Sequence, residues 1–135
     1  MFKKMLKNER GLTLIELLAV VVILGIIAAI AVPAIGNVIA NSKDDAALTE
    51  ASQIIDAAKL YVASEPTPTY PQTLEKTSTK NDLSKYLDRS SNFVLTVTKG
   101  TNDKLTYTIT GHKVNSISGL TTGATEQLIA DELKK

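Results

Sequence analysis

Residues 10–35 read Arg-Gly-Leu-Thr-Leu-Ile-Glu-Leu-Leu-Ala-Val-Val-Val-Ile-Leu-Gly-Ile-Ile-Ala-Ala-Ile-Ala-Val-Pro-Ala-Ile, and this stretch decides the fold of the 135-residue chain. Leu17 to Ile35 is an apolar run of 19 residues. As a helix rising about 1.5 Å per residue it would span about 28 Å, close to the thickness of the hydrocarbon core of a bilayer. The run is therefore predicted to cross a membrane as a helix.

Charge is distributed unevenly around this run. Four basic residues precede it: Lys3, Lys4, Lys7 and Arg10. By the positive-inside rule, this end of the chain stays in the cytoplasm. Between Arg10 and Lys43 the only charged residue is Glu16, where the apolar run begins. A charge at membrane depth costs about 2.5–3.5 kcal/mol on insertion scales, so Glu16 is expected to have a partner.

The residues at the start of the run resemble the processing site of type IV prepilins and pseudopilins. In that family a glycine precedes the cleavage site, the next residue is apolar and becomes N-methylated, and a glutamate follows four residues later. Here these positions match Gly11, Leu12 and Glu16, and the helix-breaking proline common in the family matches Pro33. Leu12 stands where phenylalanine is usual. The resemblance covers residues 8–35.

The resemblance implies a maturation route and several partners. A prepilin peptidase would cut between Gly11 and Leu12 and methylate Leu12, and a polytopic platform protein and a cytoplasmic ATPase would drive assembly. Glu16 and Pro33 would serve assembly. The chain would be held as a single-pass protein of the inner or cytoplasmic membrane and would then enter a helical filament of many copies at the cell surface or outside the cell. No cofactor is expected.

Two other interpretations of the apolar run remain. One is a plain signal anchor, and the other is a secretory signal peptide cut near Ala29-Ile30-Ala31. The run is long for a signal peptide, and Glu16 would interrupt it. A helical pattern also continues past its end, which a signal peptide does not require.

The pattern divides the chain into a leader (1–11), a membrane-spanning or filament-core helix (12–36) and a globular head (37–135). From Asn41 to Ser64 the helical pattern becomes amphipathic. Its apolar stripe recurs at spacings of three and four and consists of Leu48, Ala51, Ile55, Ala58 and Val62, widened by Ile54 and Tyr61. One helix is predicted from about Thr13 to Ser64, with a kink at Pro33. Its second half belongs to the head.

The rest of the head is predicted to hold a small antiparallel sheet. Residues 93–98 and 105–110 alternate with a period of two and are joined by a segment rich in turn residues, so they predict a hairpin. A third strand is expected near Val114–Ile117. Two short helices are also expected. They run from Asn81 or Asp82 to Leu87, with Leu83, Tyr86 and Leu87 inward, and over Thr125–Lys134, with Leu128, Ile129 and Leu133 inward. The predicted fold is α+β and pilin-like, a long N-terminal helix packed on this sheet.

Residues suited to chemistry are few. The single histidine, His112, falls in a predicted turn and is expected to be solvated. Cysteine is absent, and no zinc-binding cluster or phosphate-binding loop is present in the sequence. Asn102-Asp103 is a weak candidate for calcium that a hairpin turn explains equally well. Asp44-Asp45 and Asp131-Glu132 are expected on solvated helix faces. The chain is therefore expected to be a substrate of enzymes and not an enzyme.

Two functional hypotheses follow. The first is a structural subunit of a type IV pilus, a competence filament or a type II secretion pseudopilus, which the sequence does not distinguish. The second is a membrane-anchored minor subunit or receptor whose head binds DNA or another ligand. The leader carries a net charge of +3 and the remainder −2, so the mature chain lacks the basic surface typical of DNA-binding proteins. Glu16 favours a position in the shaft of a filament.

Overall fold

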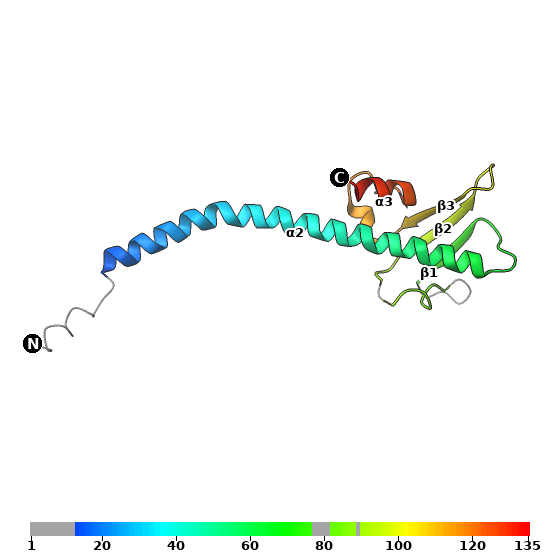
Figure 1. Ribbon diagram of the computed structural model, residues 1–135, viewed down its shortest axis with the longest axis horizontal. Helices are drawn as coiled ribbons and strands as arrows, with labels where there is room; N and C mark the ends of the chain where they lie inside the picture. Colours follow the sequence, from blue (N-terminus) through cyan, green and yellow to red (C-terminus); the bar gives the residue numbers. More distant parts are fainter. Residues whose placement is uncertain (1–12, 77–81, 89) are drawn as a thin grey trace, which may run out of the picture. The chain divides into compact units, whose positions relative to one another are not determined.

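The computed structural model describes residues 13–76, 82–88 and 90–135. The predicted leader, with Gly11, and the first mature residue, Leu12, lie outside this part of the chain. The described residues divide between two compact units, one ending at Asn41 and the other spanning Ser42–Lys135. Helix α2 (Leu14–Ser64), labelled in Figure 1, contributes residues to both units.

Helix α2 is continuous for 51 residues, including Gly25 and Pro33. Its first half is apolar on all sides, with a mean hydropathy of 3.0 in its most apolar window and none of that window buried. Among the described residues it is the one helix long and apolar enough to cross a bilayer. The prediction of one helix running to Ser64 is confirmed.

The second half of α2 turns one side to the core of the head. The buried residues recur at helical spacings and include all five positions of the predicted stripe: Ala47, Leu48, Ala51, Ile54, Ile55, Ala57, Ala58 and Val62. Tyr61, which was predicted to widen the stripe, is partly buried against the same core. The buried side of α2 therefore matches the apolar stripe predicted from the sequence.

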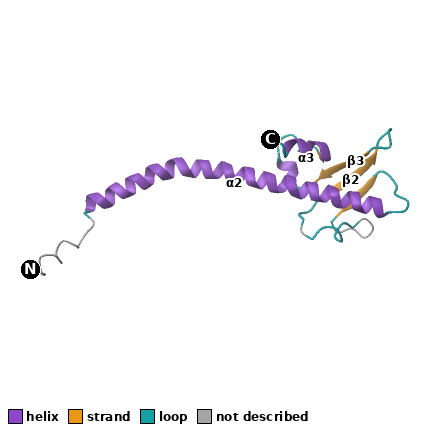
Figure 2. Ribbon diagram, viewed as in Figure 1, coloured by secondary structure: helices purple, strands orange, loops and turns teal. Residues whose placement is uncertain are grey.

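The head contains a four-stranded antiparallel sheet in the order β1-β2-β3-β4. Figure 2 labels its two central strands, β2 and β3. The strands are β1 (Gln72–Glu75), β2 (Val94–Lys99), β3 (Leu105–Thr110) and β4 (Ala124–Thr125). The predicted hairpin is β2–β3, with Leu95 opposite Ile109 and Val97 opposite Tyr107. These four side chains are buried, whereas the threonines between them face outward.

The core joins the stripe of α2 to the inner face of this sheet. Ile54, Ile55, Leu74, Leu95 and Ile109 are among its fully buried side chains. Removing side chains of this size from water contributes roughly 1.5–3 kcal/mol each. The sheet is therefore the partner surface that the second half of α2 needs.

The third strand was predicted wrongly. Residues Lys113–Ser116 form a 3₁₀ helix, η1, and the partner of β3 is the two-residue strand β4. The reason is local capping, because polar side chains at both ends of the segment bind its backbone. The side chain of His112 accepts a hydrogen bond from Val114 N–H, and that of Asn115 accepts one from His112 N–H.

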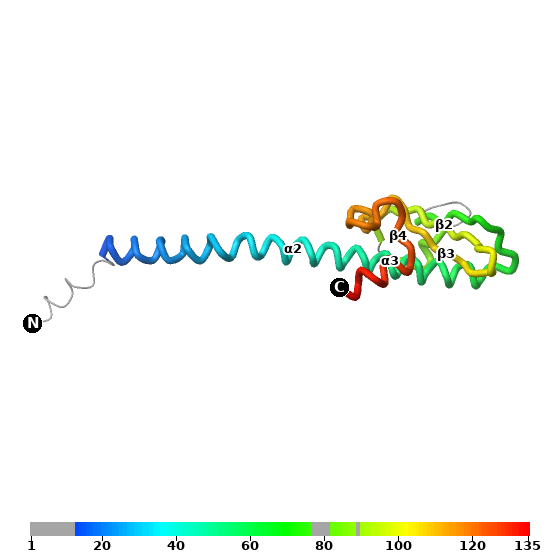
Figure 3. Tube along the Cα trace, turned by 90° about the horizontal axis from the view of Figure 1, so that it is seen from above, coloured from blue at the N-terminus to red at the C-terminus, as the bar shows by residue number. Residues whose placement is uncertain are grey.

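The two predicted short helices had different outcomes. Residues 82–87 form no helix: Ser84 to Tyr86 form a turn, and the carboxylate of Asp82 accepts from Ser84 N–H at 2.7 Å. The backbone of Asp82 forms an isolated parallel β-bridge with Glu75 of β1. Asn81 lies outside the described residues. The C-terminal helix is confirmed as α3 (Glu126–Glu132), and Figure 3 shows β4 leading into it beside β3. Only Ile129 of its three predicted inward residues is buried. Leu128 and Leu133 are exposed, which corrects the prediction.

Candidate functional sites

The N-terminus of α2 is closed by a reciprocal pair of hydrogen bonds. Thr13 N–H donates to Oε2 of Glu16 at 2.8 Å, and Glu16 N–H donates to Oγ1 of Thr13 at 3.4 Å. This is a capping box, which satisfies two of the backbone donors that a helix leaves free at its start. Within its own chain, Glu16 therefore has the backbone N–H of Thr13 as its partner.

The other predicted assembly residue, Pro33, lies inside α2 with its side chain exposed. It is far along the helix from Glu16, so the two residues do not form one site within a single copy. Because Gly11 and Leu12 lie outside the described residues, their predicted roles in cleavage and methylation stay predictions.

The first half of α2 exposes large apolar side chains on every side. The exposed fractions of Leu24, Ile30 and Val38 are 58%, 71% and 64%. Apolar surface of this extent is not stable in water, and it marks a site for lipid or for other protein. The feature is thus a surface of interaction and not a pocket for a small ligand.

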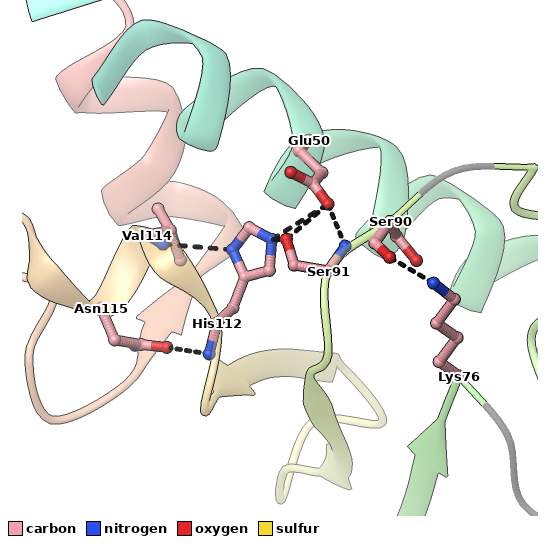
Figure 4. Close-up of polar contacts among 7 residues, drawn as sticks. All are labelled: Glu50, Lys76, Ser90, Ser91, His112, Val114 and Asn115. Carbon is pink, nitrogen blue, oxygen red and sulfur yellow. Dashed lines mark hydrogen bonds and ion pairs between the residues drawn. The ribbon is translucent and has the colours of Figure 1, made fainter. Parts of the chain in front are cut away.

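A polar cluster in the head consists of Glu50, Ser91 and His112 (Figure 4). The side chain of His112 is fully buried, and that of Glu50 is 22% exposed. Oε1 of Glu50 accepts from both the backbone N–H and the hydroxyl of Ser91, the latter at 2.7 Å, and lies 3.5 Å from Nε2 of His112. Burial by itself would raise the pKa of Glu50, but the hydrogen bonds from Ser91 and His112 outweigh burial and hold that pKa below its ordinary value.

The hydrogen bonds define the tautomer of His112. Val114 N–H donates to Nδ1 at 3.1 Å, so Nδ1 is an acceptor and the ring proton is on Nε2. Nε2 lies 3.1 Å from Oγ of Ser91, whose own proton goes to Glu50. The imidazole therefore cannot remove a proton from the Ser91 hydroxyl, and the geometry is not that of a nucleophile and its base. The hydrogen bonds of the cluster instead hold α2 to the segment that precedes β2 and to the segment that follows β3.

The prediction of a solvated His112 is therefore wrong. Gly111, with φ 68°, turns the chain after β3, and His112 follows it inward beneath α2. The spacing of His112 and Asn115, the first and fourth residues of a capping box, was the signal in the sequence. Glu50 was not singled out from the sequence, because nothing near it in the chain marks it as a partner of a distant histidine.

A second polar contact joins α2 to α3. Nζ of Lys59 lies 2.5 Å from Oε1 of Glu126 and 5.9 Å from the centre of the Tyr107 ring. The hydrogen bond to Glu126 raises the pKa of Lys59 despite partial burial. Lys59 and Glu126 bind each other, so this contact holds α3 against α2 and is not a binding site.

The weak calcium candidate, Asn102-Asp103, lies in the turn between β2 and β3. Asp103 has a left-handed backbone (φ 59°), and its carboxylate lies 2.8 Å from Nζ of Lys99. This hydrogen bond with Lys99 holds the pKa of Asp103 below its ordinary value. In the described part of the chain no group of three or more acidic, histidine or cysteine side chains is arranged to hold a metal ion.

Comparison with known proteins gives a family match for the start of the chain. Residues 6–32 match the family model described as the prokaryotic N-terminal methylation motif, and this match includes Gly11, Leu12 and Glu16. Neither the curated proteins nor the solved structures gave a match. The chain therefore carries the N-terminal signal of type IV pilin-like proteins on a long apolar helix suited to membrane anchoring.

Proposed function

We propose that this chain is a structural subunit of a type IV pilus or a pilus-like filament. It is held in the membrane by the first half of α2 and then polymerises through that same surface. The proposal covers pilus, competence and secretion filaments, which share these N-terminal residues.

One observation carries the proposal. Helix α2 changes character along its length, from a half with every large apolar side chain exposed to a half that is built into the core of the head. A signal peptide would be removed and needs no continuation into a folded domain. A helix that continues into the head gives each subunit both an apolar stem and a soluble, folded surface.

The proposal includes a set of partners that act on the chain. A prepilin peptidase cuts after Gly11 and methylates the new N-terminus at Leu12, and a platform protein and an ATPase extract the subunit from the membrane. The chain is a substrate of these enzymes and is not itself an enzyme. The buried cluster of Glu50, Ser91 and His112 is consistent with this role, because its hydrogen bonds are structural.

Mass spectrometry of sheared surface filaments tests the proposal. The expected result is an abundant chain that begins at N-methyl-Leu12. Gly11→Val should leave an unprocessed precursor in the membrane and no sheared material, because a side chain larger than alanine blocks access of the backbone to the peptidase. Gly11→Ala is the matched control and should still be cut.

Three results would contradict the proposal in different ways. A mature N-terminus near Val32 would indicate a secretory signal peptide. A processed chain that is absent from sheared material and stays in the membrane would indicate an anchored receptor. A chain present in filaments only in trace amounts beside another, abundant subunit would indicate a minor subunit.

A further inference from the structure

The ring of His112 has polar partners at both of its nitrogens (Figure 4). Nδ1 accepts a hydrogen bond from Val114 N–H at 3.1 Å, and this bond caps the start of η1. Nε2 lies 3.1 Å from Oγ of Ser91 and 3.5 Å from Oε1 of Glu50. We call the hydrogen bond from Val114 N–H to Nδ1 the His112 cap. The ring thus joins η1 to α2 and to the segment that leads into β2.

The His112 cap exists only while the ring is neutral. Nδ1 accepts a hydrogen bond through its lone pair, and a proton bound to Nδ1 uses that lone pair. A protonated imidazole is a donor at both nitrogens, so Nδ1–H and Val114 N–H would face each other as two donors. Histidine is also the side chain whose ordinary change of charge falls between about pH 5 and about pH 8. The cap is therefore a hydrogen bond that acid can break.

Burial prevents the ring from relieving this conflict by itself. The side chain of His112 is fully buried, and Val114 is fully buried beside it. A flip of the ring would exchange its two nitrogens but would leave a donor at both. A buried backbone N–H that loses its acceptor finds no water unless the chain opens. Loss of the cap therefore has to be relieved by movement of η1.

The charged ring would have a partner on its other side. Among the described residues, Glu50 is the one acidic group within ion-pair distance of His112. Burial acts to raise the pKa of Glu50, but the hydrogen bonds from Ser91 and His112 hold that pKa below 4.5. The carboxylate is thus largely charged at about pH 5. Protonation of the ring would create an ion pair with Glu50 while it removes the hydrogen bond to η1.

The other charged groups around the ring are of mixed sign. They line two surface hollows that border Glu50, and they are Lys43 and Asp44 of α2, Lys76 and Asp88 of the segment between β1 and β2, and Lys113 of η1. All of them are exposed except Lys76, which donates to the backbone oxygen of Ser90. Water and salt screen exposed charges, so the direct contact with Glu50 dominates the surroundings of the ring.

We infer that protonation of His112 releases the first turn of η1 while the rest of the head stays folded. The side chain of Asn115 limits the change, because it donates to the carbonyl oxygens of Ile109 and Leu120 at 3.2 Å and 2.8 Å. These bonds do not involve the ring and hold the loop to the end of β3. The head thus contains an acid-sensitive segment between β3 and β4, whether or not the chain acts as a filament subunit.

Nuclear magnetic resonance of the full-length chain in detergent micelles tests the release. His112 is the single histidine, so the ring nitrogens give unambiguous signals. Between about pH 7.5 and about pH 5 these signals should show uptake of a proton. Over the same range the exchange of the Val114 amide proton, corrected for the intrinsic effect of pH, should become about ten-fold faster. Amide protons in β2 and β3 should keep their protection.

Two variants separate the ring from its neighbours. His112→Asn supplies a side-chain oxygen that caps helix starts and gains no proton in this range, so protection of Val114 should be equal at both pH values. Lys113→Ala is the matched control, because it changes an exposed neighbour and keeps the ring. This control should open with acid as the wild type does.

Four results would overturn the inference. The first is a ring that gains a proton while Val114 keeps its protection, and the second is a ring that stays neutral at about pH 5. The third is an equal loss of protection in His112→Asn, which would assign the opening to another group. The fourth is loss of protection in β2 and β3 together with Val114, which would show that acid unfolds the whole head.

Discussion

Oε1 of Glu50, on α2, lies 3.5 Å from Nε2 of His112, which follows β3. Ser91 completes this contact from the segment that leads into β2. Three stretches that are distant in the sequence therefore meet through polar side chains beside an otherwise apolar core. Buried polar contacts of this kind are costly to break on one side only, since the remaining partners lose their hydrogen bonds without regaining water.

The head should fold without the apolar half of α2. A chain that begins at Ser42 retains every residue of the hydrophobic core. We expect it to be soluble, monomeric and cooperative in urea denaturation. Within it, Ile55→Asp should abolish folding, because Ile55 is 1% exposed and a charge there has no partner. Asp44→Ala, on the exposed side of the same helix, should change little. Filaments formed by the truncated chain alone would contradict this division.

Removal of His112 should destabilise this truncated head. His112→Ala leaves Val114 N–H without its acceptor and takes one hydrogen bond from the Ser91–Glu50 pair. We expect a loss of about 2 kcal/mol in the free energy of unfolding. Lys113→Ala changes the exposed neighbour of His112 and should remain within about 0.5 kcal/mol of the wild type. An equal effect of the two changes would show that the buried cluster contributes nothing.

Stability should depend on pH through Glu50. The folded-state pKa of Glu50 lies below its ordinary value of 4.5, so the charged form is favoured by folding. Its contribution is complete above about pH 4.5 and is lost as the pH falls through the lower folded pKa. Glu50→Gln should therefore cost about 1–2 kcal/mol at pH 7, and the difference from wild type should shrink below pH 4.5. Urea denaturation of both proteins across this range provides the measurement, with Asp44→Asn as the control.

Two substitutions distinguish the capping role of Glu16, which the structure shows, from its predicted role in pairing with a neighbouring copy. Its carboxylate caps α2 at Thr13, and cleavage after Gly11 would also create a positive amine at Leu12, with which Glu16 of a neighbouring copy can pair. Glu16→Gln keeps an oxygen for the cap but removes the charge, whereas Glu16→Val removes both. If pairing sets the register of assembly, both variants should be inserted and cut, yet form few or no filaments. Normal filament numbers with Glu16→Gln would show that capping alone suffices.

Gly123 should not tolerate a side chain. It has φ 149°, and a Cβ atom there would lie 2.8 Å from Cγ2 of Thr108. Gly123→Ala should therefore cost about 1–3 kcal/mol in the free energy of unfolding of the head, through backbone strain and this contact. Gly100→Ala is the control, because a Cβ atom at Gly100 meets its nearest neighbour at 3.4 Å. A Gly123→Ala head as stable as the control would show that β4 can shift to make room.

The parts of the fold with long periodic patterns were predictable from the sequence. The apolar run, the stripe from Leu48 to Val62 and the β2–β3 hairpin each repeat a pattern over several residues, and a repeated pattern outweighs local exceptions. Strands β1 and β4 have four and two residues, too few for any pattern. They are strands because β2 and β3 offer them partners, and such long-range pairing is not visible from the sequence.

The wrong predictions arose where local hydrogen bonds compete with a weak pattern. A third strand was predicted near Val114–Ile117, but Val114 and Ile117 lie three apart and both pack against the core, which fits a 3₁₀ helix. The single histidine was judged by its place in a turn. Its burial depends on Glu50 and Ser91, which are brought to it only by the complete fold.

Thr125 is both the last residue of β4 and the N-cap of α3, where its hydroxyl oxygen accepts from Leu128 N–H at 3.4 Å. No loop separates the strand from the helix, so neither can detach while the other stays in place. Amide protons in β4 and in α3 should consequently exchange with solvent in one common opening event, with the same dependence on denaturant. The last part of the head would then behave as a single cooperative unit, which opens as a whole or not at all.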